Sequence, residues 1–385
     1  MNILIITDTY KPAINGVVEV VKNLKKRLTF LGHKVFIIAP KYKGIPEEEG
    51  VLRFKSVPFP GLSEHRISWL YSRQIKKKFF IENKIDVIHS QATGTLGMLA
   101  IVLSKQYKIP HINHYQTFFE DYVHYLHLPK KIAQFSVRTF TRWFCNRVDL
   151  ITVPSLPFFT VLENYKIKRP IKLWVSGINL KKFESGVNHR KEWGIPEGAF
   201  VLSYVGRIAK EKNIPFLLEL MPYIVKKDPN IYFLIAGDGP IRKDLERYAT
   251  IMGIEKNIRF LGYIESEQIA NVYASSDLFV FSSLTETQGL VVLEAMAAGL
   301  PVVAVNAYGL KYTLKNDVGA YLVNLNRMEF LEKIFALKDN PELYAEKKAQ
   351  ALEYVKDFSY EASTEKMVEI YSSVIQEYKS KKSKN

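Results

Sequence analysis

Residues 278–305 have the sequence LFVFSSLTETQGLVVLEAMAAGLPVVAV, and this segment is the most informative one about the fold class. An apolar run, Leu278–Phe281, is followed by a polar loop, Ser282–Gln288, and then by a glycine. Leu290–Ala298 has the pattern of a buried helix, and Val302–Val305 is a second apolar run. Two apolar strands joined by a helix form a β-α-β unit, which is typical of parallel sheets covered on both faces.

The same alternation of short apolar runs and helical patterns extends over the rest of the chain. Further strand-like runs are Ile3–Thr7, Val35–Ala39, Val87–His89, Leu150–Val153, Val201–Val205, Tyr232–Ala236 and Ile258–Leu261. Helical patterns include Gly16–Leu31, Ile214–Lys227 and Glu361–Glu377. The series breaks near residues 170–178 and begins again at Val201. The sequence therefore predicts an α/β protein with two doubly wound, Rossmann-like domains that face each other across a cleft.

Length and composition are those of a soluble globular protein. The chain has 385 residues, enough for two domains that each bury a core, and 47% of the residues are hydrophobic. A single cysteine, Cys145, excludes an intrachain disulfide and favours a reducing cytoplasm. No apolar run approaches the ~20 residues of a membrane span, and the N-terminus resembles a first strand, not a signal peptide.

The net charge of +15 belongs entirely to the first half of the chain. Residues 1–177 contain 27 Lys and Arg against 12 Asp and Glu, whereas residues 178–385 contain 27 of each. A well-solvated basic surface is one interpretation of this excess. The asymmetry favours an anionic partner instead, either nucleic acid or a membrane with acidic lipids.

The loop and helix start within residues 278–305 carry candidate ligand-binding groups. Gly289 opens the helix, and its amide, with those of Gln288 and Leu290, would bind a phosphate or sugar oxygen. Glu286 lies in the loop, where a carboxylate can reach sugar hydroxyls, and Glu294 lies on the helix, where it suits a ribose diol. Taken alone, either glutamate is more often an ordinary solvated residue.

Two cations follow another predicted strand. The run Val201–Val205 leads through Gly206 to Arg207 and Lys212, so both cations emerge at a carboxyl end, where doubly wound sheets bind ligands. A departing nucleoside diphosphate gains negative charge, and fixed cations stabilise that transition state more than the ground state. Arg207 offers a planar fork, and Lys212 offers a mobile point charge.

Three further loops follow predicted strands. Gly237 and Asp238 come after one of them, and Ile264 lies in a loop whose backbone could pair with a base edge. Asp238 is equally well interpreted as a helix cap. Gly16 opens a helix after the first strand, where a glycine lets the backbone approach a ligand closely. There is no GxGxxG or Walker pattern, which argues against an ordinary dehydrogenase or P-loop enzyme.

As a set, these motifs resemble the retaining glycosyltransferases of the GT-B fold, in the family of glycogen, sucrose and lipid glycosyltransferases. The matching residues are Gly206-Arg207 with Glu211-Lys212, Ala236-Gly237-Asp238-Gly239-Pro240, and Glu286 with Glu294. The resemblance covers nearly the whole chain. It implies that residues 178–357 bind a nucleotide sugar, that residues 1–177 bind the acceptor, and that the anomeric configuration is retained. It also implies a C-terminal helix, about residues 358–380, that crosses back to the first domain.

A narrower resemblance is to the bacterial 1,2-diacylglycerol 3-glucosyltransferases. It rests on residues 12–17, 117–125 and 285–290. The resemblance implies transfer of a hexose, glucose in those enzymes, from a UDP-sugar to the free hydroxyl of diacylglycerol at the inner membrane surface.

One position departs from the pattern of this subfamily, which has a histidine directly before the threonine that matches Thr117. This chain has Gln116 there, and the nearest upstream histidine is His114. A glutamine can hydrogen-bond a sugar hydroxyl but cannot titrate, so a role that needs a ring would fall to His114 or His124, or be absent. A lone histidine beside a strand is more often structural than catalytic.

Residues 130–144 are predicted to form a basic amphipathic helix. Its apolar stripe is expected to contain Ala133, Val137, Phe140 and Phe144, with Lys131, Arg138 and Arg142 on the opposite side. Such a helix can rest on an acidic membrane, although an ordinary helix that packs this stripe on the core is an equal alternative. The candidate acceptor and membrane contacts are Lys130, Lys131, Arg138, Arg142 and Trp143.

The leading hypothesis is a UDP-sugar-dependent, retaining hexosyltransferase that makes a monoglycosyl-diacylglycerol. The candidate catalytic residues are Arg207, Lys212, Glu286, Gln116 and His114. The candidate donor-binding residues are Gly16, Gly237, Asp238, Ile264, Thr287, Gln288, Gly289, Leu290 and Glu294. The nucleotide sugar is the donor substrate, and neither a further cofactor nor a divalent metal is expected.

The expected location is the cytoplasm, peripheral on the inner face of the cell membrane, with a nucleotide sugar, diacylglycerol and an anionic lipid surface as partners. One alternative keeps the donor chemistry but uses phosphatidylinositol, a polyprenyl-linked sugar or a soluble sugar as acceptor. Another is a nucleic-acid-binding protein, which no helix-turn-helix, zinc or RNA-binding pattern supports. The hexose and the oligomeric state stay open.

Overall fold

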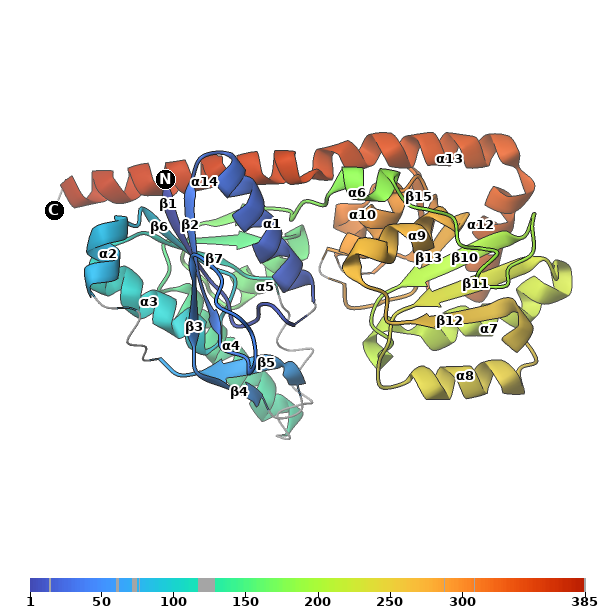
Figure 1. Ribbon diagram of the computed structural model, residues 1–385, viewed down its shortest axis with the longest axis horizontal. Helices are drawn as coiled ribbons and strands as arrows, with labels where there is room; N and C mark the ends of the chain where they lie inside the picture. The colour runs from blue at the N-terminus through green and yellow to red at the C-terminus, as the bar shows by residue number, and fades with distance from the viewer. Residues whose placement is uncertain are drawn as a thin grey trace. The chain divides into compact units, whose positions relative to one another are not determined.

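The computed structural model describes residues 1–13, 15–59, 62–70, 75, 77–116, 129–286, 288–307 and 309–383 (Figure 1). The chain forms two compact units, which are described separately. The first unit comprises Met1–Gly177 and Tyr360–Asn385, and the second comprises Ile178–Ser359.

The first unit is built on a seven-stranded sheet with the order β3-β2-β1-β6-β7-β8-β9. All neighbouring strands in it are parallel. The strands are β1 (Asn2–Ile6), β2 (Lys34–Pro40), β3 (Val51–Phe54), β6 (Val87–Ser90), β7 (His111–His114), β8 (Leu150–Val153) and β9 (Ile171–Leu173). A separate antiparallel pair consists of β4 (Ser56–Phe59) and β5 (Leu62–Ser68). The strand order reverses between β1 and β6, where open α/β sheets bind ligands.

The helices of the first unit are α1 (Gly16–Phe30), α2 (Lys77–Asn83), α3 (Thr95–Tyr107), α4 (Lys130–Cys145), α5 (Leu156–Asn164) and α14 (Tyr360–Ser383). The side chain of Asn15 accepts a hydrogen bond from the Val18 amide at 3.1 Å, which explains why α1 begins at Gly16. Although α14 ends the chain, it packs on α1, and the indole of Trp174 donates to the Ser363 carbonyl at 2.9 Å. The predicted return of the C-terminal helix to the first unit is therefore confirmed.

The second unit has a parallel, six-stranded sheet with the order β12-β11-β10-β13-β14-β15. The strands are β10 (Phe200–Val205), β11 (Ile231–Ala236), β12 (Ile258–Gly262), β13 (Leu278–Phe281), β14 (Val302–Val305) and β15 (Ala320–Val323). Here the order reverses between β10 and β13. The prediction of an α/β chain with two doubly wound parallel sheets is thus confirmed.

Helices cover both faces of the second sheet. On one face α7 (Ile214–Lys227) contacts α8 (Arg242–Ile251) and α12 (Arg327–Asp339). On the other, α10 (Leu290–Ala297) contacts α6 (Leu180–Glu184) and α13 (Pro341–Tyr354), and Figure 1 shows α8 and α10 on opposite sides. The remaining helical segments are α9 (Ile269–Ala274), α11 (Leu310–Thr313) and the 3-10 turns Lys210–Lys212, Glu255–Asn257, Ser266–Gln268 and Val355–Phe358.

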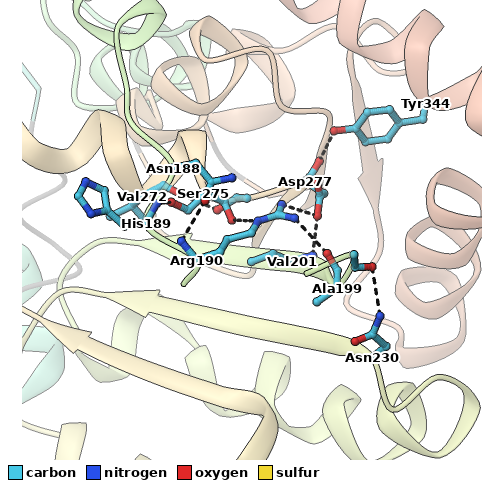
Figure 2. A network of polar contacts seen from close by, with 12 residues as sticks. Asn188, His189, Arg190, Ala199, Val201, Asn230, Val272, Ser275, Asp277 and Tyr344 are labelled. Carbon is cyan, nitrogen blue, oxygen red and sulfur yellow. Dashed lines mark hydrogen bonds and ion pairs between the residues drawn. The ribbon is translucent and has the colours of Figure 1, made fainter. Parts of the chain in front are cut away.

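A network of polar contacts joins the amino-terminal edge of the second sheet (Figure 2). Arg190 Nη2 donates to Asp277 Oδ2 at 2.7 Å, and Arg190 Nε donates to the Ser275 carbonyl at 2.9 Å. The same carboxylate oxygen accepts from the Val201 amide at 2.7 Å, and the Tyr344 hydroxyl donates to the Asp277 carbonyl at 2.9 Å. Because Val201 lies near the start of β10 and Asp277 precedes β13, the network fixes the amino-terminal ends of the two central strands. The carboxyl ends of these strands lie at the opposite edge of the sheet.

Candidate functional site

The carboxyl ends of β10, β11 and β12 are tied together by backbone hydrogen bonds. The Gly206 amide donates to the Ala236 carbonyl at 3.0 Å, and the Gly237 amide donates to the Gly262 carbonyl at 2.7 Å. Gly206 and Gly237 have φ values of 150° and 140°, and a Cβ on Gly237 would lie 1.9 Å from the Gly206 oxygen. Only glycine fits at Gly237, so three loops meet here as one close-packed edge.

Lys212 and Glu286 meet at this carboxyl edge. Lys212, on the turn after β10, donates to Glu286 Oε1 on the loop after β13. Both side chains keep some solvent exposure, 23% for Lys212 and 15% for Glu286. Ser282, which sequence reasoning missed, holds the two loops together, because its hydroxyl contacts the backbone carbonyls of Lys212 at 3.1 Å and Asn213 at 2.9 Å. Two groups 74 positions apart in the sequence thus form one accessible ion pair.

Arg207 lies at the same edge, one residue after Gly206, and is exposed. Its backbone is held by Tyr204, whose hydroxyl donates to the Arg207 carbonyl at 3.1 Å. Burial, with the nearby charges of Glu286 and Glu211, raises the pKa of Tyr204 well above its ordinary value. A neutral hydroxyl group therefore supports the backbone from which the Arg207 side chain projects.

Glu294 is half-buried on α10 and contacts Tyr273 on α9. The Tyr273 hydroxyl lies 3.2 Å from Glu294 Oε2 and 3.1 Å from the Val291 carbonyl. Burial and the Glu294 charge raise the pKa of Tyr273 well above its ordinary value. Glu294 is therefore held in place by a neighbouring helix, unlike a freely solvated surface glutamate. Sequence reasoning missed Tyr273 because no spacing rule links residues on two different helices.

The predicted helix start at Gly289 is present. Gly289 has φ 73°, and a Cβ there would lie 2.3 Å from Leu310 Cδ2, so this position requires glycine. Gln288 is buried and Leu290 is half-buried. Because the N-cap residue of α10 is Gly289, this residue has no side chain to cap the first turn. Thr287 lies outside the described residues.

Three other predicted donor-binding residues have different surroundings. Asp238 Oδ1 accepts from the Gly239 amide at 2.7 Å and Oδ2 pairs with Arg242 Nη1 at 3.4 Å, which fits the alternative of a structural capping role. Ile264 is half-buried in the loop after β12. Gly16 is exposed at the start of α1, in the first unit, whereas the other candidate donor-binding residues belong to the second.

His114 and Gln116 differ sharply in accessibility. His114 is 2% exposed on β7, its Nδ1 lies 3.0 Å from Thr152 Oγ1, and its ring packs against Trp174 with centroids 4.8 Å apart. Burial lowers its pKa well below the ordinary value, so the ring stays neutral. This environment favours the structural alternative for His114. Gln116 is half-buried just beyond the strand, where Nε2 donates to Gln91 Oε1 at 3.0 Å.

The expected apolar stripe of α4 is covered only in part. Ala133 and Phe144 are buried, whereas Phe140 is exposed and stacks on Trp143, with ring centroids 5.9 Å apart. The helix is seated through Ala133, Thr141 and Phe144, which turns other apolar side chains outward. Large exposed apolar side chains on it are Ile132, Phe135, Phe140 and Trp143. The basic residues Lys131, Arg138 and Arg142 are also exposed, and Lys130 begins the helix.

In the described part of the chain, no group of three or more His, Cys, Asp or Glu side chains could hold a metal ion. No helix there combines the length and the apolar composition that crossing a bilayer requires.

Each of the two units matches the model of a known protein family. Residues 187–354 match the family model of glycosyl transferases group 1, and residues 14–182 match that of glycosyltransferase family 4. Alpha-monoglucosyldiacylglycerol synthase of Streptococcus pneumoniae is 34% identical over 316 residues, which cover 79% of this chain and 71% of that protein. The synthase of the same name from Acholeplasma laidlawii is 29% identical over 364 residues, 89% of either chain.

Solved structures share the fold over nearly the whole chain. Sucrose-phosphate synthase from Thermosynechococcus elongatus has a TM-score of 0.78 at 20% identity, with coverage of 97% of this chain and 99% of that chain. The Anabaena protein HepE, solved in complex with UDP, has a TM-score of 0.77 at 18% identity, with coverage of 97% and 100%. The chain therefore belongs to the glycosyl transferases group 1 family and is a glycosyltransferase of the GT-B fold.

Proposed function

We propose that this glycosyltransferase retains the anomeric configuration and transfers a hexose, with glucose as the first choice, from a UDP-sugar to diacylglycerol. The observation that carries the proposal is the ion pair of Lys212 with Glu286 at the carboxyl edge of the second sheet. A cation suited to a diphosphate and a carboxylate suited to sugar hydroxyls are in contact there. Two relatives named as monoglucosyldiacylglycerol synthases support the lipid acceptor.

In the proposed reaction, the bond between the anomeric carbon and the diphosphate oxygen breaks, and the departing UDP gains negative charge. Lys212 Nζ carries three hydrogens, so it can hold Glu286 with one and a phosphate oxygen with another. Arg207 would add a planar contact to the diphosphate, and the amides at the start of α10 would bind another oxygen. These groups act most strongly on the charge that develops in the transition state.

The remaining roles concern the sugar, the ribose and the acceptor. Glu286 would accept hydrogen bonds from hexose hydroxyls, and Glu294, oriented by Tyr273, would accept from the ribose diol. The acceptor hydroxyl attacks the face from which UDP departs, and an oxygen of the UDP leaving group takes its proton. Attack on that same face gives retention, and neither a metal nor a further cofactor takes part in this scheme.

The exposed face of α4 is proposed to dock on anionic lipid at the inner surface of the cell membrane. Ile132 and Phe135 are 56% and 70% exposed, and they lie on the same helix as Lys131, Arg138 and Arg142. Exposed apolar side chains mixed with basic ones suit the boundary between headgroups and acyl chains. Each basic residue near an anionic surface contributes on the order of 1 kcal/mol, so a few are enough for reversible docking.

The donor chemistry is tested with labelled UDP-glucose, UDP-galactose or GDP-mannose and diacylglycerol in vesicles. Lys212→Met is compared with Lys210→Met, a change of an exposed lysine on the same turn. We expect loss of ion pairing and diphosphate contact to lower turnover by ~100-fold or more in Lys212→Met, whereas Lys210→Met stays close to the wild type. Circular dichroism checks the fold of each variant, and proton NMR of the product determines the anomer. Near-normal turnover by Lys212→Met would refute the assignment.

The acceptor side is tested by sedimentation with vesicles that contain or lack an acidic phospholipid. Phe135→Ser should weaken binding to acidic vesicles, because it removes an exposed apolar group from α4. Phe30→Ser, at a phenylalanine that is 75% exposed at the end of α1, is the matched control. Equal binding of both variants would contradict a role for α4. A wild type indifferent to acidic vesicles would favour the alternative of a soluble acceptor.

A further inference from the structure

Four uncharged side chains form a continuous hydrogen-bonded chain inside the first unit. Gln116 Nε2 donates to Gln91 Oε1 at 3.0 Å, and Gln91 Nε2 lies 3.1 Å from His89 Nε2. The other ring nitrogen of His89, Nδ1, lies 2.6 Å from the hydroxyl of Tyr371. The chain therefore runs from the carboxyl edge of the first sheet, through the end of β6, to the last helix, α14.

The inner members of this chain are fixed by their surroundings. His89 and Tyr371 are fully buried, and their rings make an edge contact with centroids 5.6 Å apart. Gln91 is also buried, and its backbone amide donates to the Ile6 carbonyl at 2.7 Å. Gln116, at the outer end of this hydrogen-bonded series, is half-buried. A buried interior thus ends in a side chain that keeps partial solvent exposure.

The direction of each hydrogen bond in the chain follows from the orientation of the Gln91 amide, whose nitrogen faces His89 and whose oxygen faces Gln116. Burial lowers the pKa of His89 to about 3, and burial raises the pKa of Tyr371. A neutral imidazole donates at one nitrogen and accepts at the other. Since the Gln91 amide nitrogen can only donate, His89 accepts at Nε2 and donates from Nδ1 to the Tyr371 oxygen. Gln91 Oε1 then accepts from Gln116 Nε2, which leaves the Gln116 carbonyl oxygen outside this series of hydrogen bonds.

We propose that His89 and Gln91, anchored by Tyr371, are positioning residues that aim Gln116 Oε1 at a hydroxyl of the bound hexose or of the lipid acceptor. The inference rests on the proposed function and adds to it a substrate contact for Gln116, which the sequence offered as a candidate to hydrogen-bond a hydroxyl. A glutamine oxygen accepts a hydroxyl hydrogen without titrating, so the orientation of its amide decides whether the contact forms. Because Gln91 binds the amide nitrogen of Gln116, the carbonyl oxygen of Gln116 has a fixed orientation before substrate binds.

A double-mutant cycle separates positioning from support of the fold. Tyr371→Phe removes the hydroxyl and keeps the ring, and Tyr378→Phe, on the same helix, is the matched control. We expect Tyr371→Phe to lower kcat/KM about fivefold to tenfold with Gln116 in place, the size of one neutral hydrogen bond. With Gln116→Ala as the background the loss should fall below about twofold, because coupled residues are not additive. Equal losses in both backgrounds would show a structural role alone and overturn the inference.

The same kinetics identify which hydroxyl meets Gln116. If kcat/KM falls because the KM for the nucleotide sugar rises, the contact is assigned to the hexose. If it falls because the KM for the lipid rises, the contact is assigned to the acceptor. The Tyr378→Phe control should leave both KM values unchanged. A loss in kcat with neither KM changed also fits a contact made in the transition state, provided that it disappears in the Gln116→Ala background.

A spectroscopic measurement tests the chain without any substrate. In protein labelled with ¹⁵N-histidine, the His89 signals, assigned with His89→Gln, should show a neutral ring protonated at Nδ1 from pH 6 to pH 8. Gln91→Leu removes the donor to Nε2 and should shift that nitrogen's signal. A ring protonated at Nε2, or one that titrates in this range, would overturn the inference. If the tautomer is as expected but the wild type transfers no sugar to diacylglycerol, the proposed acceptor fails and the hydrogen-bonded chain stands.

Discussion

Acidification from pH 7.5 to pH 5.0 is expected to destabilise the first unit, because three neighbouring histidines are buried there as neutral rings. His89 lies on β6, and His111 and His114 lie on β7, all at most 2% exposed. Burial lowers the pKa of His89 and of His111 to about 3, and that of His114 well below its ordinary value. The unfolded chain has ordinary histidines, with a pKa of about 6.5.

The sign and the size follow from proton linkage. At pH values between the folded and the unfolded pKa of these histidines, the unfolded state binds more protons than the folded state. The stability that the neutral rings contribute is therefore fully present above about pH 6.5 and is lost as the pH falls. At pH 5 each histidine with a folded pKa of about 3 costs about 2 kcal/mol relative to pH 7.5. His89 and His111 together therefore account for about 4 kcal/mol, and His114 adds in the same direction. This is a large part of the stability of a typical domain, roughly 5–15 kcal/mol.

Asp8 opposes this trend and has to be separated from it. Its carboxylate accepts from the Gly94 and Leu96 amides, yet burial raises its pKa to about 6. A raised carboxyl pKa makes the folded state more stable as the pH falls, by about 1 kcal/mol at pH 5. His111→Gln isolates the histidine effect, because Asp8 is the same in both proteins. The change in unfolding free energy between pH 7.5 and pH 5.0 should be about 2 kcal/mol smaller in the variant than in the wild type. This difference does not depend on how much the substitution destabilises the protein at pH 7.5.

The assay uses Cys145, the single cysteine and a buried residue of the first unit. Urea titrations at the two pH values are followed by a pulse of dithiodipyridine, which labels the thiol only where the first unit has unfolded. With a urea m-value of about 2 kcal/mol per molar, the wild-type midpoint should fall by roughly 1–2 M at pH 5, and that of His111→Gln by about 1 M less. Equal shifts in the two proteins would refute the reasoning.

Other substitutions probe the second unit. Gly237→Ala should cost at least ~3 kcal/mol, because its Cβ would lie 1.9 Å from the Gly206 oxygen, and a lowered thermal midpoint checks this. Arg190→Met should destabilise the second unit by about 3 kcal/mol, because Asp277 loses the partner at 2.7 Å, as urea unfolding would show. Glu294→Gln should raise the KM for the nucleotide sugar about tenfold with little change in the urea midpoint, and an unchanged KM would remove Glu294 from the ribose site.

Several elements were predictable because their sequence pattern has one physical explanation. β13 (Leu278–Phe281), β14 (Val302–Val305) and α7 (Ile214–Lys227) have the predicted bounds. Strands buried on both faces are continuous apolar runs, and the loops around them contain the glycine or polar residues that stop a strand. The approach of Lys212 to Glu286 also followed, because parallel strands bring their carboxyl ends to one edge of the sheet.

Other features depend on partners that no local pattern reveals. β7 (His111–His114) was not among the predicted strands, because two histidines and an asparagine resemble a loop. These polar side chains can be buried because groups distant in the sequence form hydrogen bonds with them. For example, Ser90 Oγ lies 2.8 Å from His111 Nε2. How much of the apolar stripe of α4 is covered, which the sequence left open, also depends on distant partners. Periodicity gives the spacing of apolar residues, but packing against the rest of the unit decides which of them are covered.

The Lys212–Glu286 pair suggests how the proposed site could prefer a nucleotide sugar to a simple anion. The two charges cancel, so the pair attracts free phosphate less than an unpaired lysine would. A nucleotide sugar brings two groups at once: a phosphate oxygen for the remaining hydrogens of Lys212 and hydroxyl donors for Glu286. Only a ligand with both leaves each partner fully hydrogen-bonded, and an anion alone competes with Glu286 for the lysine. The carboxylate would thereby act in selection of the donor as well as in contact with the sugar.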